Sequence, residues 1–180
     1  VWESFGSDWA DDAINQLKLE RCKVDKSEYG ELPKLNEVSN RSDICFTWNG
    51  TTSGARVPDS NWIEKNKERI VLCDATSAVF SQELDWEKLD AVSFSWQKVL
   101  GGEGGHGVIV LSPNAIRRVS TFYPERPIPK IFRLVKNGKL IQGVYEGETL
   151  NTPSMFCVAD ALDSLNWIKE IGGLKETIQR

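Results

Sequence analysis

Two charged residues stand just behind predicted strands, where side chains can meet a ligand. Asp74 follows the apolar run 69–73, and Lys98 comes shortly after the run 91–95. A lysine in a desolvated site loses its proton more readily, and its neutral amine attacks carbonyl groups. A carboxylate about 4 Å from a cation gains about 4 kcal/mol at an effective dielectric of about 20, before desolvation. That is enough to keep a pyridine nitrogen protonated. Each residue also has an ordinary explanation, because such lysines commonly extend into solvent and such aspartates commonly cap helices.

The two residues together are more specific than either one alone. In pyridoxal phosphate enzymes a lysine holds the cofactor as a Schiff base, and an aspartate pairs with the pyridinium nitrogen. Ligands of open α/β sheets bind beyond the carboxyl ends of the strands. An aspartate after one strand and a lysine after the next strand along the chain match that layout. The pair therefore predicts a pyridoxal phosphate site.

The remaining polar features indicate less. The glycine-rich stretch 101–105 is no nucleotide-binding fingerprint, because no Lys-Ser or Lys-Thr pair follows it. His106 is the only histidine, which excludes paired-histidine catalysis and histidine-rich metal sites, and a structural hydrogen-bonding role is expected for it. The cysteines lack a Cys-x-x-Cys spacing, so they are expected to be small core residues in a reducing compartment, with Cys45 and Cys73 in buried strands. No metal site is predicted, and most of the seven tryptophans are expected to lie in the core.

Strands of an α/β sheet are expected to position the Asp74–Lys98 pair. Four apolar runs have strand length, and runs that are apolar on both faces indicate a sheet covered by helices on both sides. They span residues 43–48, 69–73, 91–95 and 107–111. Helical segments separate several of these runs, so the predicted fold class is α/β with a mostly parallel central sheet.

The predicted helices and turns have identifiable end signals. Ser7 is the expected cap of a helix at 7–18, Ser112 that of the helix that follows it, and Thr152 that of a helix at 153–171 ending before Gly172. A short helix at 31–38 and a short strand at 20–24 are also predicted. A hairpin of strands 131–134 and 140–145, turning around Asn137-Gly138, completes the prediction.

Composition limits the classes of partner. The 180 residues carry 22 basic and 26 acidic side chains, a net charge of −4, and correspond to the length of one domain. An acidic chain is not expected to bind nucleic acid or an anionic membrane in general, although a local basic pocket is compatible with it. The sequence contains no apolar run long enough to cross a bilayer.

Five sequence motifs extend over essentially the whole chain. They are residues 4–9 (SFGSDW), 47–54 (TWNGTTSG), 73–77 (CDATS), 93–98 (SFSWQK) and 147–153 (GETLNTP). Together and in this order, they resemble the motifs of the class V aminotransferases with the type I pyridoxal phosphate fold, and in particular of their phosphoserine aminotransferase branch.

The resemblance implies a role for each matching residue. Lys98 would hold the cofactor and move the proton between the substrate and the cofactor, and Asp74 would bind the pyridinium nitrogen. Trp9 would stack on the cofactor ring. Thr51, with Thr52 as the neighbouring candidate, would bind its phenolic oxygen. Gln97 would contact the cofactor phosphate. Asn151 and Thr152 would reach the phosphate in a neighbouring subunit, which implies a homodimer with a shared active site.

The resemblance also implies an organisation and an activity. The family's upstream phosphate loop and downstream small domain have no match here, so residues 1–180 are expected to be a central fragment of the large cofactor-binding domain. The expected activity is amino transfer between glutamate and 3-phosphohydroxypyruvate, in the cytoplasm, as part of serine biosynthesis. The alternatives are a serine– or alanine–glyoxylate aminotransferase and a truncated, non-catalytic module. A cysteine desulfurase is disfavoured, because that group has a histidine where this chain has Gln97.

Overall fold

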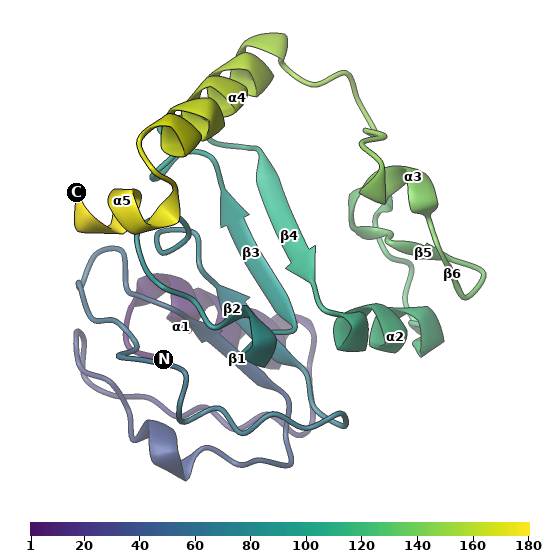
Figure 1. Cartoon of the computed structure of the whole chain (residues 1–180). Coiled ribbons are helices and arrows are strands. Elements are labelled where there is room, and N and C mark those ends of the chain that lie inside the picture. The colour runs from purple at the N-terminus through teal and green to yellow at the C-terminus, as the bar shows by residue number, and fades with distance from the viewer.

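A four-stranded sheet forms the centre of the computed structural model, which describes all 180 residues (Figure 1). Its strands lie side by side in chain order, as β1 (Ile44–Thr47), β2 (Val71–Asp74), β3 (Ala91–Ser95) and β4 (Gly107–Leu111). The first three run parallel, and β4 is antiparallel to β3. The predicted mostly parallel α/β sheet is therefore confirmed, with every strand starting and ending within two residues of its predicted run.

The core lies against one face of this sheet. Alternate strand residues point to this face because side chains alternate along a strand. Loop residues complete the cluster, so loops rather than helices cover most of this face. The strand members are Ile44, Phe46, Val71, Cys73 and Val92, and the loop members include Trp2, Trp48, Val57, Ile63, Val79 and Leu89.

The opposite face of the sheet is only partly covered. Cys45 pairs in register with Leu72, and both residues are exposed, as is Ile109 on β4. The prediction that Cys45 lies buried in its strand is therefore wrong, whereas Cys73, on the other face, is buried. The apolar character of both strand faces predicted that helices would cover this face as well. Within these 180 residues, this face is covered only in part.

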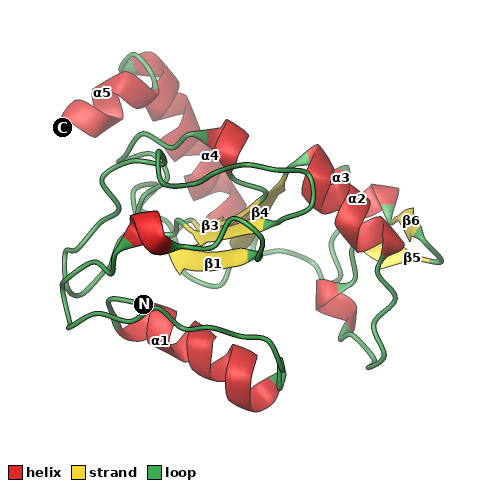
Figure 2. Cartoon of the chain, turned by 90° about the horizontal axis from the view of Figure 1, so that it is seen from below, coloured by secondary structure: helices red, strands yellow, loops and turns green.

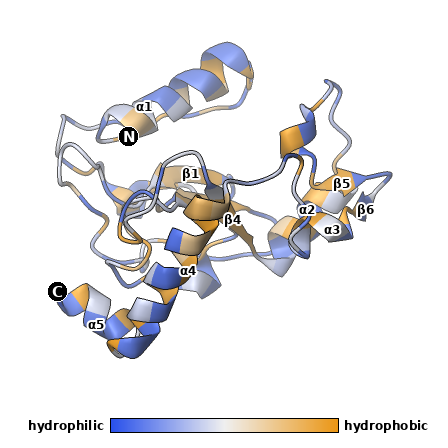
Figure 3. Ribbon diagram, turned by 90° about the horizontal axis from the view of Figure 1, so that it is seen from above, coloured by the Kyte–Doolittle hydropathy of each residue, from blue (hydrophilic) through white to orange (hydrophobic).

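Helices nonetheless lie on both sides of the sheet (Figures 2 and 3). Helix α1 (Ser4–Asp11), which continues as a π-helical segment (Asp12–Gln16), is on one side. Helices α4 (Met155–Glu170) and α5 (Leu174–Gln179) are on the other. None of the helices combines the length and apolar character needed to cross a bilayer.

The starts of two helices differ from the prediction. Helix α1 begins before Ser7, because the Glu3 carboxylate accepts hydrogen bonds from the backbone N–H groups of Phe5 and Gly6 and so caps it. Helix α4 begins at Met155, where the Ser154 hydroxyl caps it and Thr152 does not. The expected end of α4 is confirmed, since Gly172 has φ +113°.

An arm extends from β4 to one side of the sheet (Figure 1). It starts with α2 (Pro113–Thr121), which Ser112 caps as predicted. The hairpin of β5 (Val135–Lys136) and β6 (Lys139–Leu140) follows a 3-10 turn (Lys130–Phe132). Asn137 and Gly138 have φ +54° and +71°, and such paired positive values suit the predicted tight hairpin turn. The predicted first strand at 131–134 is wrong, because the 3-10 turn occupies its start and β5 lies further along the chain. The second strand is shorter than its predicted range 140–145, because the chain turns into α3 (Gln142–Tyr145).

Two short predicted elements do not form as expected. Residues 20–24 form no strand, and they lack a neighbouring strand with which to pair. The region 31–38 contains only a 3-10 turn (Leu35–Glu37); a similar turn (Trp86–Lys88) precedes β3.

Candidate functional site

Three polar strand residues meet at the carboxyl edge of β1, β2 and β3. Thr47 pairs in register with Asp74, and Asp74 pairs with Ser93. Two more backbone hydrogen bonds extend this edge beyond the strands, from Trp48 N to Asp74 O (2.7 Å) and from Ala75 N to Ser93 O (2.9 Å). The parallel ladder therefore places the Asp74 carboxylate on a rigid edge.

The two oxygens of the Asp74 carboxylate have different surroundings. Oδ1 accepts hydrogen bonds from the Thr76 backbone N–H (2.9 Å) and the Thr76 hydroxyl (2.6 Å). Oδ2 accepts none from the chain, so the half-buried carboxylate is oriented and keeps one oxygen free. Its charge also acts on a neighbouring thiol. Desolvation is the main cause that raises the pKa of the buried Cys73, and the negative charge of Asp74 adds to it.

Hydroxyl groups of two loops meet beside Asp74. The Thr51 and Ser77 side-chain oxygens are 2.7 Å apart, which joins the loop after β1 to the loop after β2. Thr52 instead contacts the Tyr29 hydroxyl. The geometry thus favours Thr51 over Thr52 as the residue close to Asp74. Ser77 and Thr76 were not predicted as site residues, although their hydroxyl-rich motif with Asp74 was visible in the sequence.

Gln97 and Lys98 are exposed on the turn that follows β3. The Gln97 side-chain oxygen accepts a hydrogen bond from the Ser95 hydroxyl. The Lys98 amine has no hydrogen bond or ion pair, while its backbone carbonyl accepts from Gly101 N (2.9 Å). The desolvated pocket considered for Lys98 is therefore not formed by these residues alone.

Helix α1, which carries Trp9, is joined to β1 through its first turn. Glu3, only 4% exposed, caps the helix and also accepts a hydrogen bond from the Thr47 hydroxyl (3.4 Å). Gly6 packs so closely here that an added Cβ would lie 3.1 Å from the Glu3 carboxylate. Trp9 lies one turn further along α1 and is 36% exposed. Its ring, with Ile14 and Leu17 beyond it, does not form the expected buried stripe.

Asn151 and Thr152 are not brought together with the other predicted residues. Both are exposed in the segment between α3 and α4 (Figure 1), and neither side chain hydrogen-bonds to the strand-end group. Because α4 starts at Met155 and Ser154 caps it, the prediction that Thr152 caps this helix is wrong.

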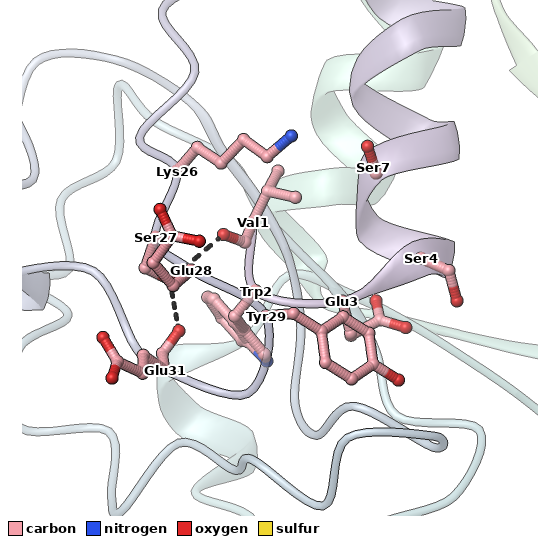
Figure 4. Close-up of a pocket in the computed structure, with 10 residues that line it drawn as sticks. All are labelled: Val1, Trp2, Glu3, Ser4, Ser7, Lys26, Ser27, Glu28, Tyr29 and Glu31. Atoms are coloured by element: carbon pink, nitrogen blue, oxygen red, sulfur yellow. Dashed lines mark hydrogen bonds between the residues drawn. The ribbon is translucent and has the colours of Figure 1, made fainter.

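A cavity of about 840 Å³ lies elsewhere, beside the first turn of α1 (Figure 4). Its walls come from the start of the chain and from residues 26–31, and they carry Lys26 together with several glutamates. None of the seven predicted site residues lines it. The candidate site is consequently the open edge of the sheet and not this cavity.

The chemical groups at the edge suit pyridoxal phosphate. A free carboxylate oxygen on Asp74 matches a protonated pyridine nitrogen, and the Thr51–Ser77 hydroxyl pair matches a phenolic oxygen. Lys98 supplies a primary amine on the neighbouring strand end. Gln97 is the one predicted phosphate ligand within this part of the chain, so the phosphate requires further donors.

Residues 15–174 match the model of the aminotransferase class-V family, and the chain belongs to that family. It is 53% identical, over all 180 residues, to the phosphoserine aminotransferase of Methanosarcina barkeri. The chain spans about half the length of the curated relatives that it matches first, 49% of the M. barkeri protein.

Solved structures show the same fold. A phosphoserine aminotransferase from Cytophaga hutchinsonii superposes with a TM-score of 0.80 at 22% identity, covering 99% of this chain and 50% of that one. An alanine–glyoxylate aminotransferase from Nostoc superposes with a TM-score of 0.76 at 18% identity, covering 99% and 48%. The α/β fold is therefore that of pyridoxal phosphate aminotransferases, of which this chain contains a part.

Proposed function

We propose that this chain is the cofactor-binding part of a pyridoxal phosphate-dependent phosphoserine aminotransferase. The observation that carries the proposal is the carboxyl edge of the sheet, where an oriented Asp74 with a free oxygen stands one strand away from Lys98. Membership of the class V family makes amino transfer the expected reaction for that edge. The bound cofactor would supply an electron sink that stabilises negative charge on the substrate carbon.

Each site residue of this chain would have a separate role toward the cofactor. Lys98 would hold the cofactor carbonyl carbon and afterwards carry the proton at its amine nitrogen. Asp74 would keep the ring nitrogen protonated, and Thr51 would hold the phenolic oxygen. Trp9 would limit access of water to one ring face. Gln97 would bind the phosphate.

Phosphohydroxypyruvate and glutamate are the proposed substrates. The support is the 53% identity to the M. barkeri phosphoserine aminotransferase, which extends from the first residue to the last. The runner-up is a serine– or alanine–glyoxylate aminotransferase, which the Nostoc structure shows to be compatible with this fold. Competition between the two keto acids in one assay distinguishes these activities.

A homodimer is the proposed assembly. The arm and the start of α4 expose many large apolar side chains, and a hollow of about 480 Å³ lies between α2 and the hairpin of the arm. Exposed apolar surface of this kind is typical of protein–protein contacts. Asn151 and Thr152 lie in the same exposed region, where they would reach the cofactor phosphate of the second copy.

The proposed context is the large domain of a cytoplasmic enzyme. All four cysteines are free thiols, which is expected of a chain from a reducing compartment. The match to about half the length of each relative supports the interpretation of residues 1–180 as a part of such an enzyme, and the resemblance of the motifs assigns this part to the middle of the large domain.

Borohydride trapping tests the proposal. The protein is incubated with pyridoxal phosphate and reduced, and the modified peptide is mapped by mass spectrometry. We expect one pyridoxyl group on Lys98, which Lys98→Ala abolishes while the circular dichroism spectrum stays unchanged. Lys139→Ala, at an exposed position on β6, is the matched control and should keep the adduct. A specific adduct on another lysine would contradict the assignment.

Turnover separates the enzyme from a non-catalytic module. An adduct on Lys98 together with amino transfer from glutamate to phosphohydroxypyruvate supports the enzyme. An adduct with no transfer to any keto acid supports a module that keeps the fold and the dimer surface but lacks activity.

A further inference from the structure

The loop at residues 96–106 joins β3 to β4 and carries Lys98, and its two ends are stacked on one another. The Trp96 and His106 rings lie 4.7 Å apart between centroids, at an interplanar angle of 2°. The last register pair of the β3–β4 ladder is Ser95 with Gly107. The stacked rings therefore form the next rung beyond the ladder and close the loop at its base.

Backbone hydrogen bonds hold the same loop from inside. Gly102 N donates to Trp96 O and Gly101 N donates to Lys98 O, each at 2.9 Å. Gly101 has φ +67°, and a Cβ on Gly102 would lie 3.3 Å from the Cβ of Trp96. Glycine is thus favoured at both positions, at Gly101 by its positive φ and at Gly102 by the close approach to Trp96.

The middle of the loop is anchored to α4. Leu100 is 6% exposed, and its carbonyl accepts a hydrogen bond of 2.6 Å from the Ser164 hydroxyl. Glu103 and Gly104, at the tip, are exposed. The residues around Lys98 are therefore fixed while the far end of the loop is free.

His106 holds its place through its ring and not through hydrogen bonds. Its buried Nδ1 atom has no partner, and the imidazole makes no hydrogen bond elsewhere. The expected hydrogen-bonding role of this histidine is therefore wrong. The face-to-face stack on Trp96 is its principal interaction.

We propose that His106 is a positioning residue, whose stack on Trp96 fixes the backbone of Lys98 for its reaction with pyridoxal phosphate. The inference rests on the proposed function. The Lys98 amine makes no hydrogen bond or ion pair, so its position depends on where the loop holds its main chain. A displacement of about 1 Å in a reacting group can slow a reaction by about 100-fold. The Trp96–His106 stack, called the clamp below, would therefore affect the rate at which Lys98 reacts.

Hydrogen exchange of the cofactor-free protein gives the first test. Mass spectrometry follows the peptide 97–107, which contains the Gly101 and Gly102 amides. We expect His106→Ala to raise exchange in this peptide about tenfold, because the base of the loop opens. His106→Phe keeps an aromatic face and should restore slow exchange. Glu103→Ala, at the free tip, is the matched control and should match the wild type.

The rate of cofactor capture gives the second test. Pyridoxal phosphate is added, samples are reduced with borohydride at intervals, and the Lys98 adduct is counted. We expect capture to slow about tenfold in His106→Ala and to recover in His106→Phe, with an unchanged melting temperature in both. If His106→Ala does not fold, His106→Leu fills the same space without an aromatic face and replaces it.

The outcomes distinguish the clamp from the proposed function. Wild-type exchange and capture in His106→Ala would overturn the clamp. Recovery by His106→Asn but not by His106→Phe would also overturn it, since that pattern indicates a hydrogen bond. If the wild type forms no adduct on Lys98, the proposed function fails, and exchange alone still decides whether the stack fixes the loop.

Discussion

Asp74 shows how one side chain can be both anchored and available. Thr76 holds Oδ1 with two hydrogen bonds, which sets the direction of the carboxylate, and Oδ2 stays free at the edge of the sheet. An acceptor that is already oriented needs little reorganisation energy when it binds a cation. The local hydroxyl groups thereby turn a strand-end aspartate into a ligand-ready group.

Asp74→Asn isolates the charge from the geometry. The asparagine oxygen can still accept from Thr76, but the negative charge is lost. The ion pair is worth about 4 kcal/mol at about 4 Å and an effective dielectric of about 20, before desolvation. We therefore expect the half-reaction with glutamate to slow by at least about 100-fold, measured by stopped-flow absorbance. The denaturant midpoint should stay close to that of the wild type. If the variant loses stability as strongly as it loses the half-reaction, the role of Asp74 is structural.

Cys73 gives the fold a dependence on alkaline pH. Desolvation, with smaller contributions from Asp74 and Cys45, raises the pKa of this 1% exposed thiol well above its ordinary value of 9.0. Above pH 9 the unfolded thiol releases its proton while the folded thiol retains it. The free energy of unfolding should therefore be insensitive to this group below about pH 9 and fall above it, by up to about 1.4 kcal/mol per pH unit.

Urea unfolding of Cys73→Ala between pH 8 and pH 10 checks this expectation. The variant should be less stable at pH 8, because it leaves a cavity, but should lose less stability than the wild type as pH rises. Cys22→Ala, at an exposed thiol, should keep the wild-type slope. If the free energy of unfolding falls equally steeply with pH in Cys73→Ala and in the wild type, other groups cause the loss of stability at alkaline pH.

At the scale of elements, strands were more predictable than helix starts. The three parallel strands are short apolar runs that end in polar residues, and their burial against one core keeps that signal local. Helix α1 depends instead on Glu3, an unusual capping residue that also contacts Thr47 on β1. Ser7 has the better capping propensity, but this tertiary contact decides where the helix starts. The Trp96–His106 stack likewise joins residues that no local pattern connects.

Glu3→Ala tests the role of this cap. Two helix N–H groups and the Thr47 hydroxyl lose their acceptor in a buried place. We expect a loss of about 1–3 kcal/mol in the free energy of unfolding, measured with urea. Glu20→Ala, at an exposed side chain without a hydrogen bond, should change stability by less than about 0.5 kcal/mol. Equal effects of the two changes would contradict the capping role.

At the scale of the molecule, the arm presents an exposed apolar surface beside the sheet. Phe132, 68% exposed, lies there with Phe122 and Tyr123 around one hollow. Local sequence patterns indicated the hairpin, whereas the exposure of these side chains depends on how the arm extends. A second copy of the protein is the proposed cover for this surface.

Phe132→Glu places a charge on that surface. Because the side chain is exposed in one copy, we expect the fold to be kept and the dimer to dissociate, at least tenfold more readily than the wild type. Sedimentation velocity over a concentration series measures this change. Leu17→Glu, at an exposed apolar position near the end of the α1 segment, is the matched control. An unchanged dimer in Phe132→Glu would place the interface elsewhere.

The order of the strands in the sheet is also their order in the chain. During synthesis, each strand can pair with the strand that left the ribosome just before it. No strand has to wait for a later segment to be inserted between it and its neighbour. The sheet can therefore be completed from β1 to β4 as translation proceeds, and the Lys98 loop is closed by the last pairing step.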